Sequence, residues 1–356
     1  MTLEFEAALN LGRFSYEAKF DAADEVVVLF GHSGAGKSIT LQTIAGLQRP
    51  ERGRIVVGGR PVFDSNQGID LPPQRREVGY VVQELALFPH MTVAQNIAFG
   101  VPSGPGRDER VQRLLALLQI EELARRRPGT LSGGQRQRVA LARALAREAR
   151  ILLLDEPFSA LDDALRVTLR RELLRLRKEL GLTIIFVTHD LREAHLLADR
   201  LAVFDAGRIL QFGPREDVFR RPANRRVAAL TGTSNIFRGR VLGREPEGLM
   251  LEIAGARFRA EAPAWNPAPG EEVDVAIRAE RVNLRRAVEI ENALHAVIRE
   301  EFAFGSSHTL HFEPEGAGPP VEVEIASRPY EVLGVAENRH WLVELPAADL
   351  HVMPIA

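Results

Sequence analysis

The residues whose types and spacing most clearly indicate a binding site are Gly31 to Ser38. They match the pattern G-x-x-x-x-G-K-[ST]. Glycines let backbone N–H groups close around phosphate oxygens, and a helix that begins after the loop adds its positive end. Lys37 can reach the β- and γ-phosphates, and the Ser38 hydroxyl can ligate Mg²⁺. We therefore predict a nucleotide site whose contacts come from Gly31, His32, Ser33, Gly34, Ala35, Gly36, Lys37, Ser38 and Ile39.

Three apolar runs must position these and other polar residues. Residues 25–30 lead into the glycine loop, and residues 151–154 and 183–187 end in Asp155-Glu156 and in Thr188-His189-Asp190. Nearly continuous apolar runs of this length are typical of strands buried on both faces of a parallel sheet. Open α/β sheets bind ligands at the carboxyl ends of their strands, where these polar residues would gather. Helical patterns at 108–126, 134–150 and 163–180 complete an α/β fold.

Composition narrows the class of protein. The 356 residues are 45% hydrophobic and 26% charged, which suits two or three globular domains. A net charge of −2 argues against binding nucleic acid through bulk charge. With no cysteine, the chain has no disulfide, thiolate nucleophile or cysteine-bound metal. No apolar run approaches the ~18 residues of a membrane span, and the N-terminus is acidic, so we expect a cytoplasmic chain.

The pattern of apolar and polar residues changes after about Gly232. Short runs of alternating apolar and polar residues, broken by glycine and proline, predict a small all-β module. Residues 235–241 resemble residues 292–298, and residues 270–275 have a counterpart in 338–343. This weak repeat suggests two intertwined small barrels. We therefore divide the chain into domains 1–232 and 233–356, with a helical subdomain at about 85–150.

A second motif, Leu131-Ser132-Gly133-Gly134-Gln135, opens the helical pattern that precedes the run at 151–154. A Ser-Gly-Gly turn alone is an ordinary helix cap. Here it resembles the signature motif of ABC-transporter ATPases, and other segments resemble that family's motifs in the same order. These are the Q-loop glutamine Gln83, the Walker B Asp155, the general base Glu156, the D-loop Ser159-Ala160-Leu161-Asp162 and the switch histidine His189.

The resemblance implies an ABC-type P-loop NTPase, with a parallel-sheet core and a helical subdomain, followed by an OB-like or TOBE domain. Its cofactors would be ATP and Mg²⁺, the metal being held by Ser38, Gln83 and Asp155. Catalysis would depend on Lys37, Gln83, Glu156 and His189. In this family two chains enclose two nucleotides, so Ser132, Gly133 and Gly134 would meet the ATP of the opposite subunit. Gln135 and Asp162 are further expected nucleotide contacts. The adenine-stacking aromatic of the family has no match here, because Ala7 to Asn10 occupy its window.

The type of transporter is suggested by residues 58–65 and 68–76, which resemble a segment of molybdate and sulfate importer ATPases. We therefore expect an ATPase subunit that drives uptake of an oxyanion. The alternatives are an importer ATPase for ferric iron, a polyamine or a sugar and, less favoured, a soluble ABC ATPase without a transport role. The expected partners are a second copy of the chain, transmembrane permease subunits and a periplasmic or surface substrate-binding protein, with no nucleic acid. The chain would lie peripherally on the cytoplasmic side of the inner membrane.

Overall fold

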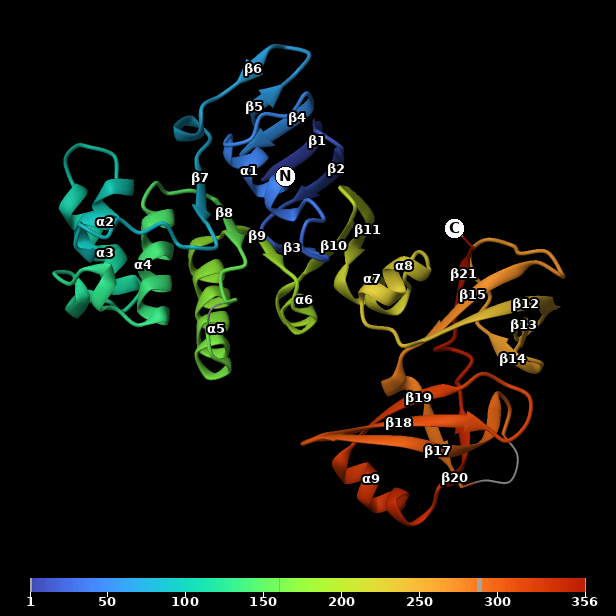
Figure 1. The fold of residues 1–356 in the computed structure, drawn as a ribbon. Helices are drawn as coiled ribbons and strands as arrows, with labels where there is room; N and C mark the ends of the chain where they lie inside the picture. The colour runs from blue at the N-terminus through green and yellow to red at the C-terminus, as the bar shows by residue number, and fades with distance from the viewer. Residues whose placement is uncertain (1, 160, 287–289, 356) are drawn as a thin grey trace. The chain divides into compact units, whose positions relative to one another are not determined.

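The computed structural model describes residues 2–159, 161–286 and 290–355, which form two compact units, Met1–Arg215 and Glu216–Ala356 (Figure 1). The sequence places the boundary later, at residues 232–233. Residues 216–232 contain most of helix α7 (Arg215–Arg220) and all of α8 (Arg225–Leu230). Helix α8 packs on strands β12 (Asn235–Glu245) and β15 (Glu272–Ile277), so these residues join the second unit.

The first unit is built on one large sheet. Its strands are β1 (Leu3–Leu11), β2 (Phe14–Ala22), β3 (Val26–Phe30), β4 (Arg52–Val57), β5 (Arg60–Asp64), β6 (Ile69–Asp70), β7 (Val78–Val81), β8 (Ile151–Asp155), β9 (Thr183–Thr188), β10 (Arg200–Asp205) and β11 (Arg208–Pro214). Its longer helices are α1 (Lys37–Ala45), α2 (Val93–Gly100), α3 (Arg107–Leu117), α4 (Gly133–Leu145), α5 (Asp163–Leu180) and α6 (Leu191–Leu197). Short 3₁₀ turns lie at η1 (Pro73–Arg75), η2 (Glu121–Leu123) and η3 (Pro128–Thr130).

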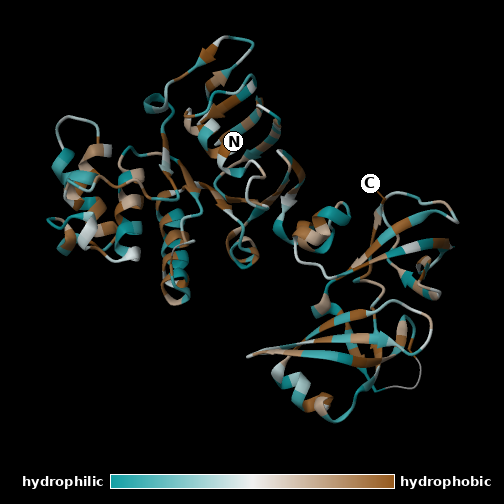
Figure 2. Ribbon diagram, in the orientation of Figure 1, coloured by the Kyte–Doolittle hydropathy of each residue, from teal (hydrophilic) through white to brown (hydrophobic). Residues whose placement is uncertain are grey.

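The strand order in this sheet is β6-β5-β4-β1-β2-β11-β10-β3-β9-β8-β7. Strands β10, β3, β9, β8 and β7 are parallel, whereas β1, β2, β4, β5 and β6 pair antiparallel. Every residue of β3, β8 and β9 is buried, which explains why their sequences are apolar except at the ends of β8 and β9 (Figure 2). The predicted parallel-sheet core is confirmed, and an antiparallel extension adds to it.

The helical subdomain predicted at about 85–150 corresponds to the segment between β7 and β8. It holds α2, α3 and α4, and α4 packs on both α2 and α3. The helix predicted over 108–126 is too long, because α3 ends at Leu117 and the chain continues into η2. Gln119 follows with a φ of 54°, a left-handed conformation that an α-helix cannot contain.

The second unit contains two five-stranded sheets, ordered β14-β13-β12-β15-β21 and β16-β20-β17-β18-β19. Its further strands are β13 (Gly248–Ile253), β14 (Ala256–Ala260), β16 (Asn283–Arg285), β17 (Ala293–Phe304), β18 (Ser307–Pro314), β19 (Val321–Ala326), β20 (His340–Glu344) and β21 (His351–Pro354). Helix α9 (Ser327–Leu333) and the turns η4 (Ala279–Arg281) and η5 (Val335–Glu337) connect them. After building the second sheet, the chain returns to the first through β21, and one hydrophobic core is shared by both.

Two buried asparagines occupy equivalent positions of the sequence repeat. The Asn235 amide donates to the Glu322 carbonyl and accepts from the Glu322 N–H, both at 2.8 Å. The Asn292 amide makes the same pair of bonds to the main chain of Arg259, at 2.6 and 2.7 Å. Glu322 lies on the edge strand β19 and Arg259 on the edge strand β14. Each half of the repeat therefore binds an edge of the other sheet.

We predict that Asn235→Ala lowers the unfolding free energy of the second unit by about 2–4 kcal/mol, because it leaves both main-chain groups of Glu322 unpaired in a buried place. Chemical unfolding followed by circular dichroism measures the loss. The exposed Asn266, whose side chain accepts from Arg244, provides the control variant Asn266→Ala. Equal stability of the two variants would contradict the structural role of Asn235.

Candidate functional site

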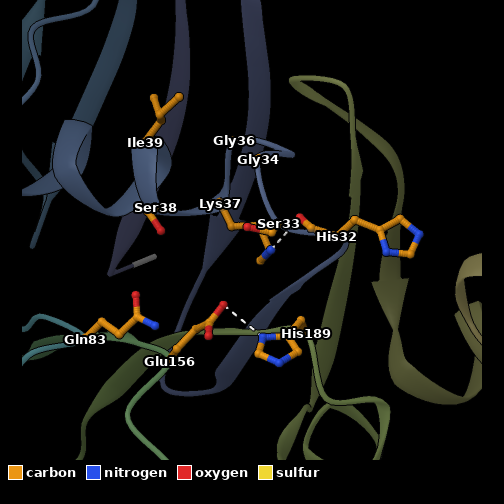
Figure 3. A pocket seen from close by; sticks show the side chains of 10 residues that line it. All are labelled: His32, Ser33, Gly34, Gly36, Lys37, Ser38, Ile39, Gln83, Glu156 and His189. Carbon is orange, nitrogen blue, oxygen red and sulfur yellow. Dashed lines mark hydrogen bonds and ion pairs between the residues drawn. The ribbon is translucent and has the colours of Figure 1, made fainter. Parts of the chain in front are cut away.

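The glycine loop joins β3 to α1 and follows a path that only glycine allows (Figure 3). Gly31, Gly34 and Gly36 have φ values of 155°, 79° and 105°. A Cβ atom on Gly31 would lie 2.3 Å from the carbonyl oxygen of Phe204, and one on Gly36 would lie 3.0 Å from the ring of Tyr16. The sequence prediction of strand, loop and helix is confirmed at this point.

Lys37 is folded back over the loop. Its Nζ donates to the carbonyl oxygens of Gly31 and His32, each at 2.8 Å, and the residue is only 5% exposed. Burial lowers the pKa of Lys37, and the nearby carboxylates of Glu156 and Asp155 partly oppose that change. The loop therefore holds a cation next to its own backbone, where an anionic ligand could replace the carbonyl contacts.

Three oxygen-bearing side chains meet beside the loop. The Ser38 Oγ donates to Asp155 Oδ1 at 2.9 Å, and the Tyr80 hydroxyl donates to Asp155 Oδ2 at 3.3 Å. Burial raises the pKa of Asp155, an effect that both hydrogen bonds reduce. Hydroxyl and carboxylate oxygens are hard ligands of the kind that Mg²⁺ prefers, so this donor set fits that metal.

Tyr80 was missed by the sequence reasoning. It lies in β7, which pairs in parallel with β8, and so its side chain can reach the end of the neighbouring strand. The sequence feature that could have identified Tyr80 is its phenol, which stands in an otherwise apolar strand that leads to Gln83. Its partner could not be identified without the order of the strands.

Glu156 and His189 form the opposite wall of the site. They follow β8 and β9, which are adjacent, and the Glu156 Oε1 lies 3.0 Å from the His189 Nδ1 (Figure 3). Glu156 has a φ of 44°, and its N–H donates to the Val187 carbonyl oxygen at 3.1 Å. The Glu156 side chain is 17% exposed, whereas that of His189 is 59% exposed. The structure therefore brings together two residues that are far apart in the sequence.

A cavity of about 450 Å³ lies between these groups. It is lined by His32, Ser33, Gly34, Gly36, Lys37, Ser38, Ile39, Gln83, Glu156 and His189. Of the other predicted residues, Gly31 and Ala35 are buried parts of the loop, and Asp155 reaches the site through Ser38. A pocket with phosphate-binding backbone on one side and a carboxylate–imidazole pair on the other can bind a nucleotide and orient a water molecule for attack.

The signature residues do not line this pocket. Ser132 and Gln135 cap α4 reciprocally, with a bond of 3.3 Å from the Gln135 N–H and one of 3.0 Å from the Ser132 N–H. Gly133 and Gly134 form the first turn of that helix. Asp162 caps α5 by accepting from the Leu165 N–H at 2.9 Å, and Ala160 lies outside the described residues. Ser132 and Asp162 are exposed, whereas Gly134 is buried.

The fold and the glycine loop at residues 31–38 define a P-loop nucleoside triphosphatase. Residues 20–159 match the ABC transporter family. The spermidine/putrescine import ATP-binding protein PotA of Rubrobacter xylanophilus is 40% identical over 354 residues, which cover 96% of this chain and 90% of the relative. PotA 1 of Pseudomonas aeruginosa is 45% identical over 273 residues, covering 74% of this chain and 72% of the relative. The chain belongs to the ATP-binding proteins of ABC importers and is an ATP hydrolase.

Solved structures agree with this assignment for the first unit. A dimeric, post-hydrolysis structure of the ATP-binding cassette MJ0796 with ADP and Pi matches with a TM-score of 0.50 and 28% identity, covering 60% of this chain and 98% of that one. The cbiO1 protein of Clostridium perfringens, part of the transporter complex cbiONQ, matches with a TM-score of 0.52 and 32% identity, covering 61% of this chain and 90% of that one.

Within the described ranges, no helix is long and apolar enough to cross a membrane.

We predict that Asp155→Asn makes the nucleotide-free chain more stable at pH 7, by about 1 kcal/mol. The raised pKa means that the folded state penalises the charged carboxylate, and a neutral amide removes this penalty. The penalty exists above the raised pKa and disappears when the pH falls below the ordinary value of 3.8, because the group is then protonated in both states.

Thermal unfolding between pH 7 and pH 4 tests this prediction, with a midpoint about 2–4 °C higher for the variant at pH 7 and a smaller gap at pH 4. The control is Asp163→Asn, since that side chain is 94% exposed. A less stable Asp155→Asn chain at pH 7 would show that the charge of Asp155 supports the fold.

Proposed function

We propose that the pocket of Figure 3 binds Mg²⁺-ATP and that two copies of the chain hydrolyse it together to drive a polyamine importer. The observation that carries the catalytic part is the position of one cation, one hydroxyl–carboxylate pair and one carboxylate–imidazole pair around a single cavity. ATP hydrolysis needs positioning and charge neutralisation far more than covalent chemistry, and this arrangement supplies both.

The charge of the phosphates would be neutralised from the loop side. Lys37 would exchange its contacts with the Gly31 and His32 carbonyls for the β- and γ-phosphate oxygens. Ser38, Asp155 and Gln83 would hold Mg²⁺, which supplies additional positive charge at the phosphates. The hydrogen bond between Ser38 and Asp155 already places two of these three donors together.

The attacking water would be activated by residues on the wall of the cavity opposite the glycine loop. Glu156 is the proposed general base, and its carboxylate faces the cavity after β8. The Nδ1 of His189 contacts that carboxylate, and the other side of the imidazole ring would contact the γ-phosphate. A base and its orienting partner within hydrogen-bond distance are the arrangement that such a step requires.

The second copy would complete the site. Ser132, Gly133, Gly134, Gln135 and Asp162 lie outside the pocket of their own chain, although they offer helix N-termini suited to phosphate. The matching cassette MJ0796 was solved as a dimer with ADP and Pi, which supports this arrangement. The second unit, residues 216–356, would act as a TOBE-like dimerisation or regulatory domain.

The cargo of the importer follows from the relatives. Those described above are named as spermidine/putrescine import proteins, which favours the polyamine alternative over the oxyanion that the segments at 58–76 suggested. Permease subunits and a substrate-binding protein would be the further partners, with the chain bound peripherally at the cytoplasmic face of the membrane.

We expect Glu156→Gln to bind ATP but to lose turnover by at least about 100-fold, because the amide cannot accept the proton of the attacking water. The variant should accumulate as an ATP-bound dimer, visible by size-exclusion chromatography with ATP and Mg²⁺. Lys37→Ala is the contrasting variant, and its affinity for ATP should fall about tenfold or more. Normal turnover in Glu156→Gln would contradict the assignment of the base.

Uptake measurements test the cargo. Deleting the gene from its host should reduce uptake of labelled spermidine or putrescine, and the wild-type chain but not Glu156→Gln should restore it. Molybdate and sulfate uptake serve as the comparison and should be unchanged. Loss of oxyanion uptake with normal polyamine uptake would contradict the polyamine proposal and favour an oxyanion as the transported substrate.

A further inference from the structure

A buried carboxylate next to the site plays no part in the chemistry proposed above. Glu193, in α6, is 4% exposed. Its Oε2 accepts from the Thr188 Oγ1 at 2.7 Å, and its Oε1 accepts from the Arg170 Nη2 at 2.7 Å. Thr188 ends β9, and Arg170 lies on α5, so this carboxylate links three elements of the first unit. Both oxygens have a short partner, as a carboxylate buried away from water requires.

The contacts of Thr188 place this network on both sides of His189. The same hydroxyl that donates to Glu193 accepts from the N–H of Asp190 at 3.0 Å. The Asp190 carboxylate then caps α6 by accepting from the N–H groups of Arg192 and Glu193, at 2.7 and 3.2 Å. The residues before and after His189 are therefore bound to α6 through a closed set of hydrogen bonds.

The His189 side chain itself has little packing to orient it. It is 59% exposed, yet its Nδ1 lies 3.0 Å from the Glu156 Oε1. An exposed ring samples several rotamers unless its backbone and one polar contact restrict it. The restriction must come largely from the main chain, whose direction at this point is set by Thr188 and Asp190.

We propose that Glu193, held by Arg170, is a positioning residue that directs the His189 imidazole toward Glu156 through the Thr188 hydroxyl. This inference rests on the role of His189 in the proposed function. Glu193 touches neither the cavity nor the reacting groups, so it affects turnover only through His189.

The competing explanation is a purely structural ion pair that joins α5, α6 and β9. Such a pair would lower stability when broken, but the turnover of the folded protein would remain normal. A positioning role predicts a lower kcat at unchanged ATP affinity, and it predicts that the effect disappears once His189 is removed. The two explanations therefore differ in measurable quantities.

The experiment uses the full chain and compares Thr188→Val, Thr188→Ser, His189→Ala and the double variant Thr188→Val with His189→Ala. Valine keeps the shape of Thr188 and removes its hydroxyl, whereas serine keeps the hydroxyl. Steady-state ATPase activity, equilibrium ATP binding and thermal unfolding are measured for each. Glu179→Gln serves as the control, because Glu179 is a half-exposed partner of Arg175 on α5.

We expect kcat to fall about tenfold in Thr188→Val, with the Kd for ATP unchanged within about twofold, which corresponds to losing one hydrogen bond to a charged group. Thr188→Ser should stay within about twofold of the wild type. The double variant should be no slower than His189→Ala alone. Glu179→Gln should match the wild type in every measurement.

Each other outcome has a defined meaning. Normal turnover in Thr188→Val together with an inactive His189→Ala would overturn the inference and leave the proposed function intact. Normal turnover in His189→Ala would instead contradict the proposed function. If Thr188→Val does not fold, Glu193→Gln is measured by the same criteria. Failure of both variants to fold would assign the network to stability alone and overturn the positioning role.

Discussion

The passage of the chain through Gly31 is the constraint on which the site depends. The Cα of Gly31 lies so close to the carbonyl of Phe204 in β10 that any side chain would collide with it. Because the loop starts there, β3 can lead directly into α1, and Lys37 can reach back to the loop carbonyls. The phosphate-binding backbone is thus a consequence of close packing between two parallel strands.

The far end of α1 is held just as firmly. Arg76 is 1% exposed and donates through Nη1 to the carbonyls of Thr43 and Ile44, at 2.7 and 3.2 Å, in the last turn of the helix. A cation at a helix C-terminus is favourable. Here it gives the Ile44 carbonyl a partner and adds a second donor to the Thr43 carbonyl, which also accepts from the Gly46 N–H at 3.3 Å. Gly46 allows this approach, because a Cβ there would lie 2.5 Å from the Arg76 Nε.

The site places charge in buried surroundings, and this works against stability. The raised pKa of Asp155 and the lowered pKa of Lys37 both result from burial, and each group partly compensates the other. Hydrogen bonds from Ser38 and Tyr80 reduce the cost further. A binding site for a highly charged ligand must keep such groups apart from water, so the free chain is less stable than a neutral core would allow.

The sequence alone determined the features that depend on short stretches of chain. The loop at 31–38, the buried strands β3, β8 and β9 and the β-rich tail follow from local patterns, and the positions of Glu156 and His189 follow from the rule for strand ends. Only the tertiary structure decided the partners of Tyr80 and Glu193, the paired roles of Asn235 and Asn292, and the end of α3 at Leu117. The contacts of Tyr80, Asn235 and Asn292, and the contact of Glu193 with Arg170, join segments far apart in the chain. They depend on strand order and register, which a local pattern of side chains does not specify.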